Sequence, residues 1–457
     1  MTPETKVTDL EGLKKRVEEA IDRRRDQIIA IGRRIFAHPE LGYKERETAA
    51  LVEETMKSLG IEPRTEIALT GLRADLEGAE PGPAVAVLGE LDAVLCPGHP
   101  HAHPETGASH SCGHNGQVAS MLGVAMGLLD GGALKHLSGR VSLMAVPAEE
   151  YVEIEYRQRL RKDGKIRFLG GKQEFLRLGE FDDVDMVMMV HMGSEYEGKL
   201  ASIGGTSNGF IGKFITYRGR EAHAGGAPHQ GINALNAAML GLMGIHAQRE
   251  TFRDADHIRV HPIITKGGNL VNIIPSEVTM ETYVRGATME AITDASARVN
   301  RALEAGAHAI GAEVEIEEIP GYLPRLSAQE IGEIFRDNLT NWIDEDKIAW
   351  GGHGAGSTDL GDISHIMPAI HPMIGGAAGA GHSADFEIID EDLAYIIPAK
   401  AMALTIVDLL GVGAARAREV IEGFEPQYDK ESYLKMWDTV LQTDGADRLS
   451  RQTEGPA

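Results

Sequence analysis

The chain has 457 residues, 42% of them hydrophobic and 25% charged, which is the balance of a globular protein and excludes a disordered chain. Its length predicts two or three domains. The formal net charge of −24 disfavours nucleic acid or an anionic membrane as a partner, because both would be repelled. No apolar run reaches the about 20 residues that span a membrane, and no hydrophobic region follows the polar N-terminus, so we expect a cytoplasmic protein.

The first part of the chain alternates between helical and strand-like patterns. Apolar positions recur at helical spacing over residues 11–36 and 44–59, and a strand region follows at 64–76. A further helix is predicted at 117–129. Three apolar runs have the pattern of strands buried on both faces, as in an open α/β sheet. These runs span residues 84–91, 140–146 and 184–190.

Polar side chains with catalytic potential follow each of these three runs. Asp92 follows the first run, the pair Glu149 and Glu150 follows the second, and His191 follows the third. Open α/β sheets bind their ligands at the carboxyl ends of the strands, so these residues are site candidates. Beside a metal, one carboxylate of a pair can ligate while the other moves a proton; a solvated acidic turn is the alternative.

The segment 108–117 places His110, Cys112 and His114 within five residues of a glycine-rich loop. A thiolate and imidazoles at this spacing can converge on one cation if the backbone turns, which indicates half of a metal site. Ordinary solvated polar residues are the alternative. The two cysteines of the chain, Cys96 and Cys112, are better explained by metal or redox chemistry than by a structural disulfide.

The pattern changes after Gly204 and predicts a second domain at residues 207–320, inserted into the first. Its elements follow the β-α-β-β-α-β order of a split-βαβ fold. The first domain would comprise residues 1–206 and 321–457, ending in one or two surface helices. The expected strands of the insertion lie near 210–217, 260–265, 278–285 and 313–319, and its helices near 234–249 and 289–310. Beyond it we expect helices near 328–342 and 393–410 and a strand-like piece at 369–375.

Taken together, these motifs and their order resemble the peptidase M20 family of metal-dependent amidohydrolases, in particular its amidohydrolase branch, subfamily D, with aminoacylase-like, auxin-conjugate and aminobenzoyl-glutamate hydrolases. The residues that carry the resemblance are His38-Pro39-Glu40-Leu41-Gly42 with Glu45 and Thr48, Gly89-Glu90-Leu91-Asp92-Ala93, Cys112-Gly113-His114-Asn115, Pro147-Ala148-Glu149-Glu150, His191-Met192, His223-Ala224 with Pro228, Asn272-Ile273-Ile274-Pro275, and Gly381-His382.

The resemblance implies an α/β catalytic domain with a mostly parallel central sheet flanked by helices, and a ferredoxin-like lid that also forms a homodimer interface. It implies two divalent metals per subunit. The implied ligands are Cys112, His114, Glu150, His191 and His382. Thiolate, imidazole and carboxylate together suit Zn, Mn or Co rather than Mg or Ca.

The resemblance also implies roles for the remaining candidates. Glu149 would be the general base, and Asp92 would orient a metal ligand. His223, on the lid, would reach the active site of the opposite subunit and stabilise the oxyanion. Asn272 and Arg285 would hold a substrate carboxylate, a task that suits the guanidinium fork.

Three features depart from the family pattern. The loop 94–109 carries extra histidines that could form an accessory metal site or line the entrance, and we favour lining. An insertion at 151–185 replaces the usual glycines after the acidic pair, and its charge-dense part, 151–168, is typical of a solvated face. Asn115 and the segment 356–359 resemble the aminobenzoyl-glutamate hydrolase and dipeptidase branch. The histidines and the cysteine of that loop region are Cys96, His99, His101, His103 and His110.

We therefore expect a metal-dependent hydrolase that cleaves the amide bond of N-acyl or N-aroyl amino acids, such as aminobenzoyl-glutamate-like conjugates. A dipeptidase or exopeptidase of the same family is the first alternative, although Cys112 in place of the usual bridging aspartate weakens it. A non-catalytic metal-binding scaffold is the second. Such a scaffold would be free to lose the base Glu149, which this chain retains.

Overall fold

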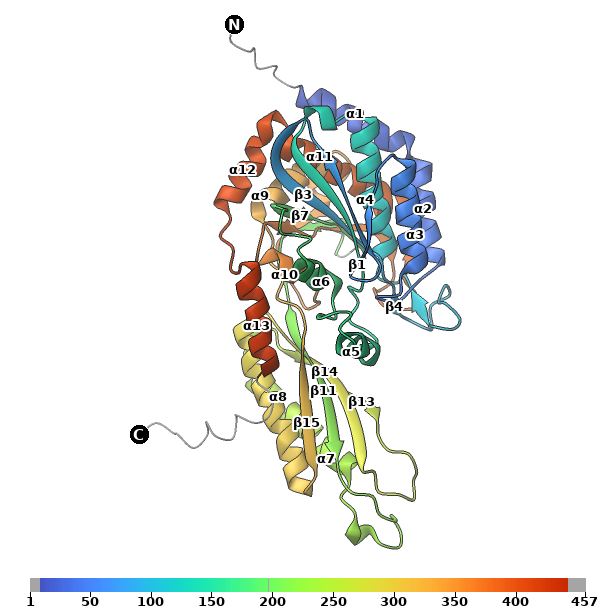
Figure 1. The fold of residues 1–457 in the computed structure, drawn as a ribbon, viewed down its shortest axis with the longest axis vertical. Coiled ribbons are helices and arrows are strands. Elements are labelled where there is room, and N and C mark those ends of the chain that lie inside the picture. The colour runs from blue at the N-terminus through green and yellow to red at the C-terminus, as the bar shows by residue number, and fades with distance from the viewer. Residues whose placement is uncertain (1–8, 196, 443–457) are drawn as a thin grey trace, which may run out of the picture. The chain divides into compact units, whose positions relative to one another are not determined.

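The computed structural model describes residues 9–195 and 197–442 (Figure 1). Its contacts divide these residues into two compact units. The first unit comprises the described residues up to 205 together with 326–352 and 362–427. The second comprises 206–325, 353–361 and the described residues from 428 onward. The domain boundaries at 206 and 320 stay predictions. By contacts, residues 353–361 and 428–442 group with the second unit.

The main sheet of the first unit has the strand order β1-β2-β6-β3-β7-β18. The neighbouring pairs β6/β3, β3/β7 and β7/β18 are parallel, whereas β1/β2 and β2/β6 are antiparallel. The predicted mostly parallel α/β sheet is thus confirmed. The strands are β1 (Arg64–Ile67), β2 (Gly71–Glu77), β3 (Glu80–Glu90), β6 (Ser138–Val146), β7 (Met186–Met188) and β18 (Ala369–Ile370).

A second, smaller sheet in this unit has the order β16-β9-β19-β20, with β8 pairing β19. The strand-like piece predicted at 369–375 forms two strands, β18 in the main sheet and β19 in the smaller one. Two short strands, β4 (Val94–Leu95) and β5 (Ala108–Ser109), bracket the histidine-rich loop. The strands of the smaller sheet are β8 (His191–Ser194), β9 (Ala201–Ile203), β16 (Ile348–Trp350), β19 (Met373–Ala378) and β20 (Glu387–Ile388).

The helix α4 is apolar all round and lies in the core, where it contacts α1, α2 and α11. One stretch, Asp392–Leu410, has the length and hydropathy of a membrane span, but 83% of it is buried inside the fold, as in a core helix. The helices of this unit are α1 (Leu10–Arg23), α2 (Arg25–Ala37), α3 (Arg46–Ser58), α4 (His114–Asp130), α5 (Ile154–Lys162), α6 (Gly171–Leu178), α9 (Gln329–Leu339), α10 (Leu360–Ser364), α11 (Ile397–Leu410) and α12 (Ala415–Gly423).

The single helix predicted at 11–36 is wrong in one respect, because the chain forms two helices there. Arg24 leaves the helical conformation, with φ −94° and ψ 2°. Its side chain instead donates to Asp130 at 2.7 Å, at the end of α4. The apolar period continues across the break, so the sequence pattern does not mark it.

The second unit is an antiparallel sheet of order β12-β14-β11-β15, with β13 also paired to β14, and two helices packed on one face. This is the predicted split-βαβ, ferredoxin-like order. The buried pair Lys213 and Glu318 lies between sheet and helix, with Nζ 2.6 Å from the carboxylate. The elements are β11 (Gly209–Arg218), α7 (Ala234–Gln248), β12 (Arg259–Val260), β13 (Ile263–Lys266), β14 (Glu277–Gly286), α8 (Met289–Ile310), β15 (Glu313–Pro320) and α13 (Lys430–Gln442).

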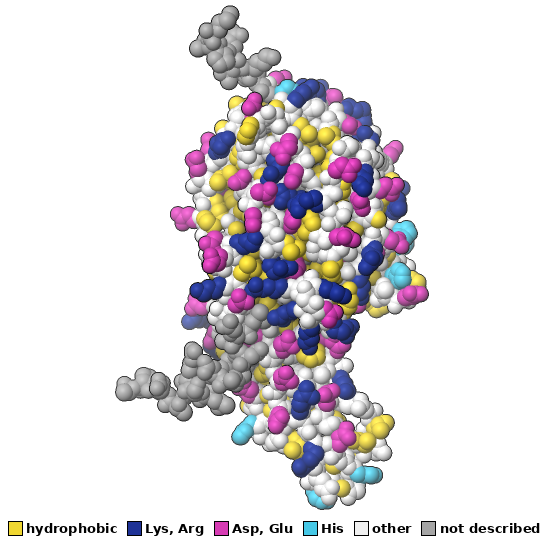
Figure 2. All heavy atoms as spheres, in the orientation of Figure 1, with side chains coloured by type: hydrophobic (Ala, Val, Ile, Leu, Met, Phe, Trp, Pro, Cys, Tyr) yellow, Lys and Arg dark blue, Asp and Glu magenta, His cyan; other side chains and the backbone are white. Residues whose placement is uncertain are grey.

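Basic and acidic side chains are interspersed over the face shown in Figure 2. The net charge of −24 is therefore not gathered into one acidic patch on that face. A mixed surface of this kind offers no single-sign field for a polyelectrolyte partner.

Candidate active site

The parallel strands of the first unit bring three chain segments to the same edge of the sheet. β3 ends at Glu90, β6 ends at Val146 and β7 ends at Met188, so the residues that follow them are delivered together. The helix α4 begins beside them at His114. Gly113, just before it, has φ 85°, and a Cβ there would lie 2.9 Å from Cβ of Met192, so this turn requires glycine.

Cys112 lies at the centre of the predicted ligand set. Its Sγ is 3.4 Å from Nε2 of His191 and 3.3 Å from Nε2 of His382. The same His382 nitrogen is 2.9 Å from Oε1 of Glu150. The ligand atoms of Cys112, His114 and His191 lie within 4.8 Å of one another, and so do those of Cys112, Glu150 and His382. The structure thus brings together all five predicted metal ligands.

A third group of ligand atoms consists of Glu90, His114 and Glu149. The sequence reasoning did not select Glu90 as a site residue, although it stands in one of the family motifs. Its carboxylate lies 3.0 Å from Nε2 of His114 and is held by Lys172 and by a 2.7 Å hydrogen bond from Gln117. Glu90 is the last residue of a buried strand. A charged residue at such a position is rare, and this could have identified Glu90 from the sequence.

Asp92 orients both halves of the cluster. Its carboxylate accepts the backbone N–H of Glu150 at 2.9 Å, and its backbone carbonyl lies 2.8 Å from Nδ1 of His114. An N–H at Nδ1 of His114 is the natural donor to that carbonyl, which leaves Nε2 to act as a ligand atom. The orienting role of Asp92 stays a prediction, for which this geometry is suited.

The charges in the cluster shift each other's ionisation. Burial and the charge of Glu150 raise the pKa of the Cys112 thiol, but the charges of His114 and His191 outweigh them and lower it to about 6. Hydrogen bonds with Cys112 and Glu150 raise the pKa of His382 to about 11. An anionic thiolate and carboxylates crowded among imidazoles are a donor set that a divalent cation would neutralise.

One orphaned atom supports the same fit. Nε2 of His114 is buried without a hydrogen-bond partner among the described residues, although Oε2 of Glu90 is 3.0 Å away. An ion shared by the two atoms would satisfy both, because imidazole nitrogen and carboxylate oxygen are both zinc ligands. The residues present therefore fit a metal site.

Glu149 is 8% exposed, and its Oε2 lies 3.9 Å from Nε2 of His114. Behind the turn that carries it lies Glu45, whose carboxylate accepts the backbone N–H of Ala148 at 2.8 Å. Burial, together with the charge of Asp92, raises the pKa of Glu45 to about 7. In the sequence, Glu45 is only part of a motif. In the structure, it bonds to the backbone of the turn that carries Glu149 and Glu150.

The three predicted lid residues all lie in the second unit. His223 and Asn272 are exposed neighbours, since the N–H of Ala224 donates to the carbonyl of Asn272 at 2.9 Å. Nδ1 of His223 accepts the N–H groups of Gly225 and Gly226 at 3.1 and 2.9 Å, so the proton of the neutral ring is at Nε2. His223 is therefore poised as a hydrogen-bond donor.

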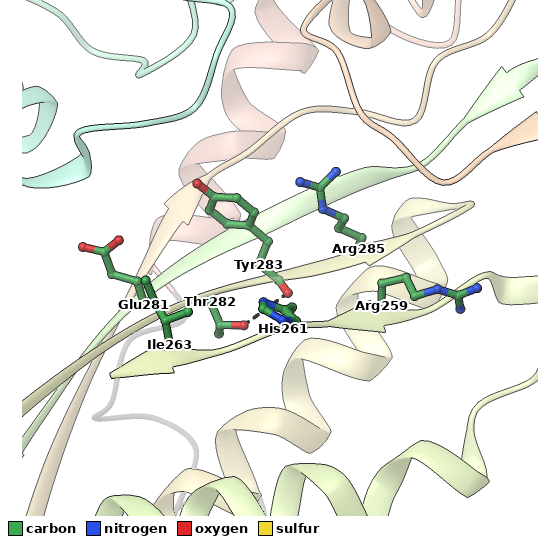
Figure 3. Close-up of a pocket in the computed structure, with 7 residues that line it drawn as sticks. All are labelled: Arg259, His261, Ile263, Glu281, Thr282, Tyr283 and Arg285. Carbon is green, nitrogen blue, oxygen red and sulfur yellow. Dashed lines mark hydrogen bonds between the residues drawn. The ribbon is translucent and has the colours of Figure 1, made fainter. Parts of the chain in front are cut away.

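Arg285 lies elsewhere on this unit, on β14. Its guanidinium donates to Oγ of Ser357 at 3.1 Å and lies 5.5 Å from the ring centre of Phe210. It lines a pocket of about 370 Å³ on the sheet, shown in Figure 3. Arg259 stands directly opposite it in the β12/β14 ladder, so two guanidinium groups share one face. The other lining residues are His261, Ile263, Glu281, Thr282 and Tyr283.

Asn115 and the histidine-rich loop serve the packing of the first unit. The amide of Asn115 donates to the carbonyl of Gly32 and to the hydroxyl of Tyr395, at 3.1 and 3.0 Å. Nε2 of His99 lies 2.9 Å from the carbonyl of Phe386. His99 and His101 line a pocket of about 600 Å³. That the loop lines the entrance to the active site stays a prediction. Among the described residues, none of the groups with metal-ligand spacing includes a residue of this loop or His110.

The chain is similar to several known proteins. The peptidase dimerisation domain of the M20 peptidases matches residues 206–310. The mouse Xaa-Arg dipeptidase (Mus musculus) is 29% identical, with 88% of this chain and 90% of the relative covered. The N-acyl-L-amino acid amidohydrolase of Geobacillus stearothermophilus is 27% identical, with 69% of this chain and 82% of the relative covered.

Two solved structures share the fold. A dinuclear metal-binding M20 peptidase from Bacillus subtilis has a TM-score of 0.63 and 22% identity, with 85% of this chain and 99% of that chain covered. An aminobenzoyl-glutamate utilization protein from Klebsiella pneumoniae has a TM-score of 0.65 and 18% identity, with 87% of this chain and 100% of that chain covered. The match over residues 206–310 and these relatives confirm the predicted resemblance to the hydrolases of the M20 peptidase family.

Proposed function

We propose that this protein is a metal-dependent amidohydrolase that cleaves the amide bond of N-acyl or N-aroyl amino acids. The observation that carries the proposal is the convergence of one thiol, three imidazoles and two carboxylates around Cys112 and His114, with the carboxylate of Glu149 beside them. Relatives support the substrate class, because two of them are named for N-acyl amino acid and indoleacetyl-amino acid hydrolysis.

Metal binding supplies the Lewis acidity of the site. The ligands would be Cys112, His114, Glu150, His191 and His382, and two ions of Mn, Zn or Co suit this donor set. When bound, the ions polarise an amide carbonyl and lower the pKa of water.

The protein's own residues then move the protons. Glu149 accepts a proton from the attacking water and delivers it to the departing amine, which requires a carboxylate that is close to the ligands without being consumed by them. Its 3.9 Å separation from Nε2 of His114 is compatible with both requirements. Asp92 keeps His114 in the tautomer that presents Nε2 to the metal.

The lid residues extend the proposal to substrate binding and assembly. His223 donates to the developing oxyanion, and Asn272 with Arg285 binds the carboxylate of the amino acid product. The matched dimerisation domain supports a homodimer. A cytoplasmic location and a small-molecule amide substrate complete the proposal.

A dipeptidase is the second candidate, favoured by the match to Xaa-Arg dipeptidase along most of both chains. It differs from the first in its need to bind a free α-ammonium group. A non-catalytic scaffold is disfavoured, because the cluster retains the base Glu149 together with every expected type of ligand.

The test is hydrolysis of a panel of N-acetyl amino acids, N-aroyl glutamates and dipeptides that end in arginine or another residue. The protein is first treated with a chelator and then supplied with Mn, Zn or Co. We expect amino acid release that disappears on chelation and returns with one of these ions. Preference for N-acyl over dipeptide substrates supports the first candidate, and the reverse supports the dipeptidase. No turnover of any substrate with stoichiometric metal bound would overturn both.

A further inference from the structure

The insertion that follows the acidic pair contains a buried arginine. Its charge-dense part, 151–168, is predicted as a solvated face. Arg159 on α5 agrees with this prediction, because its side chain is 67% exposed. Arg157, on the same helix, does not: it is fully buried, at 0% exposure. The prediction of a solvated face is therefore wrong for Arg157. A buried guanidinium is costly unless its donors are satisfied, so the contacts of Arg157 show what keeps it there.

Those contacts are with the backbone of the acidic turn. Nη1 donates to the carbonyl of Leu169 at 2.8 Å and to that of Ala148 at 3.3 Å, and Nη2 donates to the carbonyl of Glu150. The guanidinium also lies 5.5 Å from the ring centre of Tyr43. One planar group thus ties together the two peptide carbonyls on either side of Glu149.

The chain leaves space for this group. A Cβ at Gly42 would lie 2.3 Å from Nη2 of Arg157 and 2.8 Å from the Cα of Ala148, so only glycine fits beside the turn. Ala148 itself adopts the left-handed conformation, with φ 57°. A non-glycine residue in this region is strained and persists where surrounding contacts fix it.

Two carboxylates fix the same turn through its N–H groups. Glu45 accepts the N–H of Ala148 at 2.8 Å, and Asp92 accepts the N–H of Glu150 at 2.9 Å. Arg157 supplies the opposite kind of contact, since it binds the carbonyls. Ala148 and Glu150, the residues on either side of Glu149, are therefore each held at both the backbone N–H and the backbone carbonyl.

We propose that Arg157 is a positioning residue: through its hydrogen bonds to the carbonyls of Ala148 and Glu150, it holds Glu149 and Glu150 in their working geometry. The inference rests on the proposed function for the roles of these two glutamates. It gives the insertion a function in this chain, because α5 supplies the guanidinium that fixes the catalytic turn. Lysine cannot replace it, because one ammonium group lacks the planar fork that reaches three carbonyls at once.

The experiment compares Arg157→Lys and Arg157→Ala with the matched control Arg159→Ala, which removes an exposed arginine from the same helix. Steady-state kinetics are measured on the best substrate of the panel. A misplaced catalytic group costs on the order of 100-fold in rate, so we expect kcat to fall by about that factor in both Arg157 variants with little change in KM. Free guanidinium should restore part of the kcat of Arg157→Ala and leave the control unchanged.

A second measurement is independent of turnover. The chelated proteins are titrated with Co²⁺ alone, and the thiolate-to-cobalt absorption of Cys112 is followed. We expect weaker Co²⁺ binding in Arg157→Lys than in the control, because Glu150 is a proposed ligand. If the wild type binds Co²⁺ but hydrolyses nothing, the proposed function fails, while the titration still tests Arg157.

Two results would overturn the inference. The first is an Arg157→Lys protein that unfolds at the wild-type temperature and retains wild-type kcat and Co²⁺ affinity. The second is a lowered unfolding temperature with unchanged kcat per folded molecule, since Arg157 would then only stabilise the fold. If Arg157→Ala does not fold, Arg157→Lys, which keeps the charge, decides the matter.

Discussion

Replacing Glu149 by glutamine tests the proposed base with the smallest change in shape. The amide keeps the volume of the side chain but cannot accept a proton from water. Besides Asp92, whose carboxylate accepts the backbone N–H of Glu150, two other carboxylates lie near His114 and Cys112. Both are already engaged, because Glu90 is bound by Lys172 and Glu150 by His382. Neither of these two carboxylates is therefore free to take over the proton transfer.

A positioned base contributes about 10²–10⁴-fold to the rate, which corresponds to about 3–5 kcal/mol of barrier. With both neighbouring carboxylates engaged, we expect the loss of kcat in Glu149→Gln to lie in the upper half of that range. Metal content should stay near that of the wild type, because the five proposed ligands remain. Glu155→Gln is the matched control, since its side chain is 68% exposed on α5.

The assay combines kcat and KM on the best substrate with metal analysis of the same protein sample. An activity within tenfold of the wild type would refute the base role of Glu149. A large loss of bound metal would equally refute the reasoning, because Glu149 would then act as a ligand and its rate effect would be indirect.

Three further changes test other parts of the structure. Cys112→Ser should weaken metal binding by more than the about 10–100-fold typical of losing an outer-shell partner, measured by competition with a chelator. Gly171→Ala would place a Cβ 1.7 Å from the carbonyl oxygen of Pro147, so the free energy of unfolding in urea should fall by at least about 1–3 kcal/mol. Lys213→Met should cost about 3–5 kcal/mol in the same assay, because it leaves the buried Glu318 carboxylate without its cation. Burial alone raises the pKa of Glu318, but the charge of Lys213 and the hydrogen bonds of Lys213 and its neighbours hold that pKa below the ordinary value. The stability that this pair gives the wild type should therefore be lost as the pH falls below about 4.3. A wild-type stability that is unchanged down to the folded pKa would contradict the pairing.

Local sequence pattern was enough for most of the fold. The continuous apolar runs mark β3 and β6 because strands buried on both faces need apolar residues at every position. The β-α-β-β-α-β order gave the ferredoxin-like sheet of the second unit, since that order limits the pairings that short connections allow. The strand-end rule predicts that Asp92, Glu149 and His191 lie at one edge of the sheet, because each follows a buried parallel strand.

Residues whose role depends on distant contacts were not predictable in this way. At the break between α1 and α2, Arg24 bonds to Asp130, more than one hundred positions away, and the apolar periodicity on either side shows no sign of it. In the sequence, Glu40 is only part of a family motif. In the structure, its carboxylate accepts the N–H groups of Arg46 and Thr48 and so caps α3.

The sequence by itself indicated the kind of site, because thiol, imidazole and carboxylate side chains are the usual zinc ligands and these residue types recur in an order that resembles the M20 family. Only the tertiary structure decided which charged side chains are buried and hold the turn that carries Glu149 and Glu150. Arg157 and Glu45 look like surface charges in the sequence, but folding buries them on either side of the acidic turn. Burial is a property of the assembled layers, and a charged residue in a local pattern carries no sign of it.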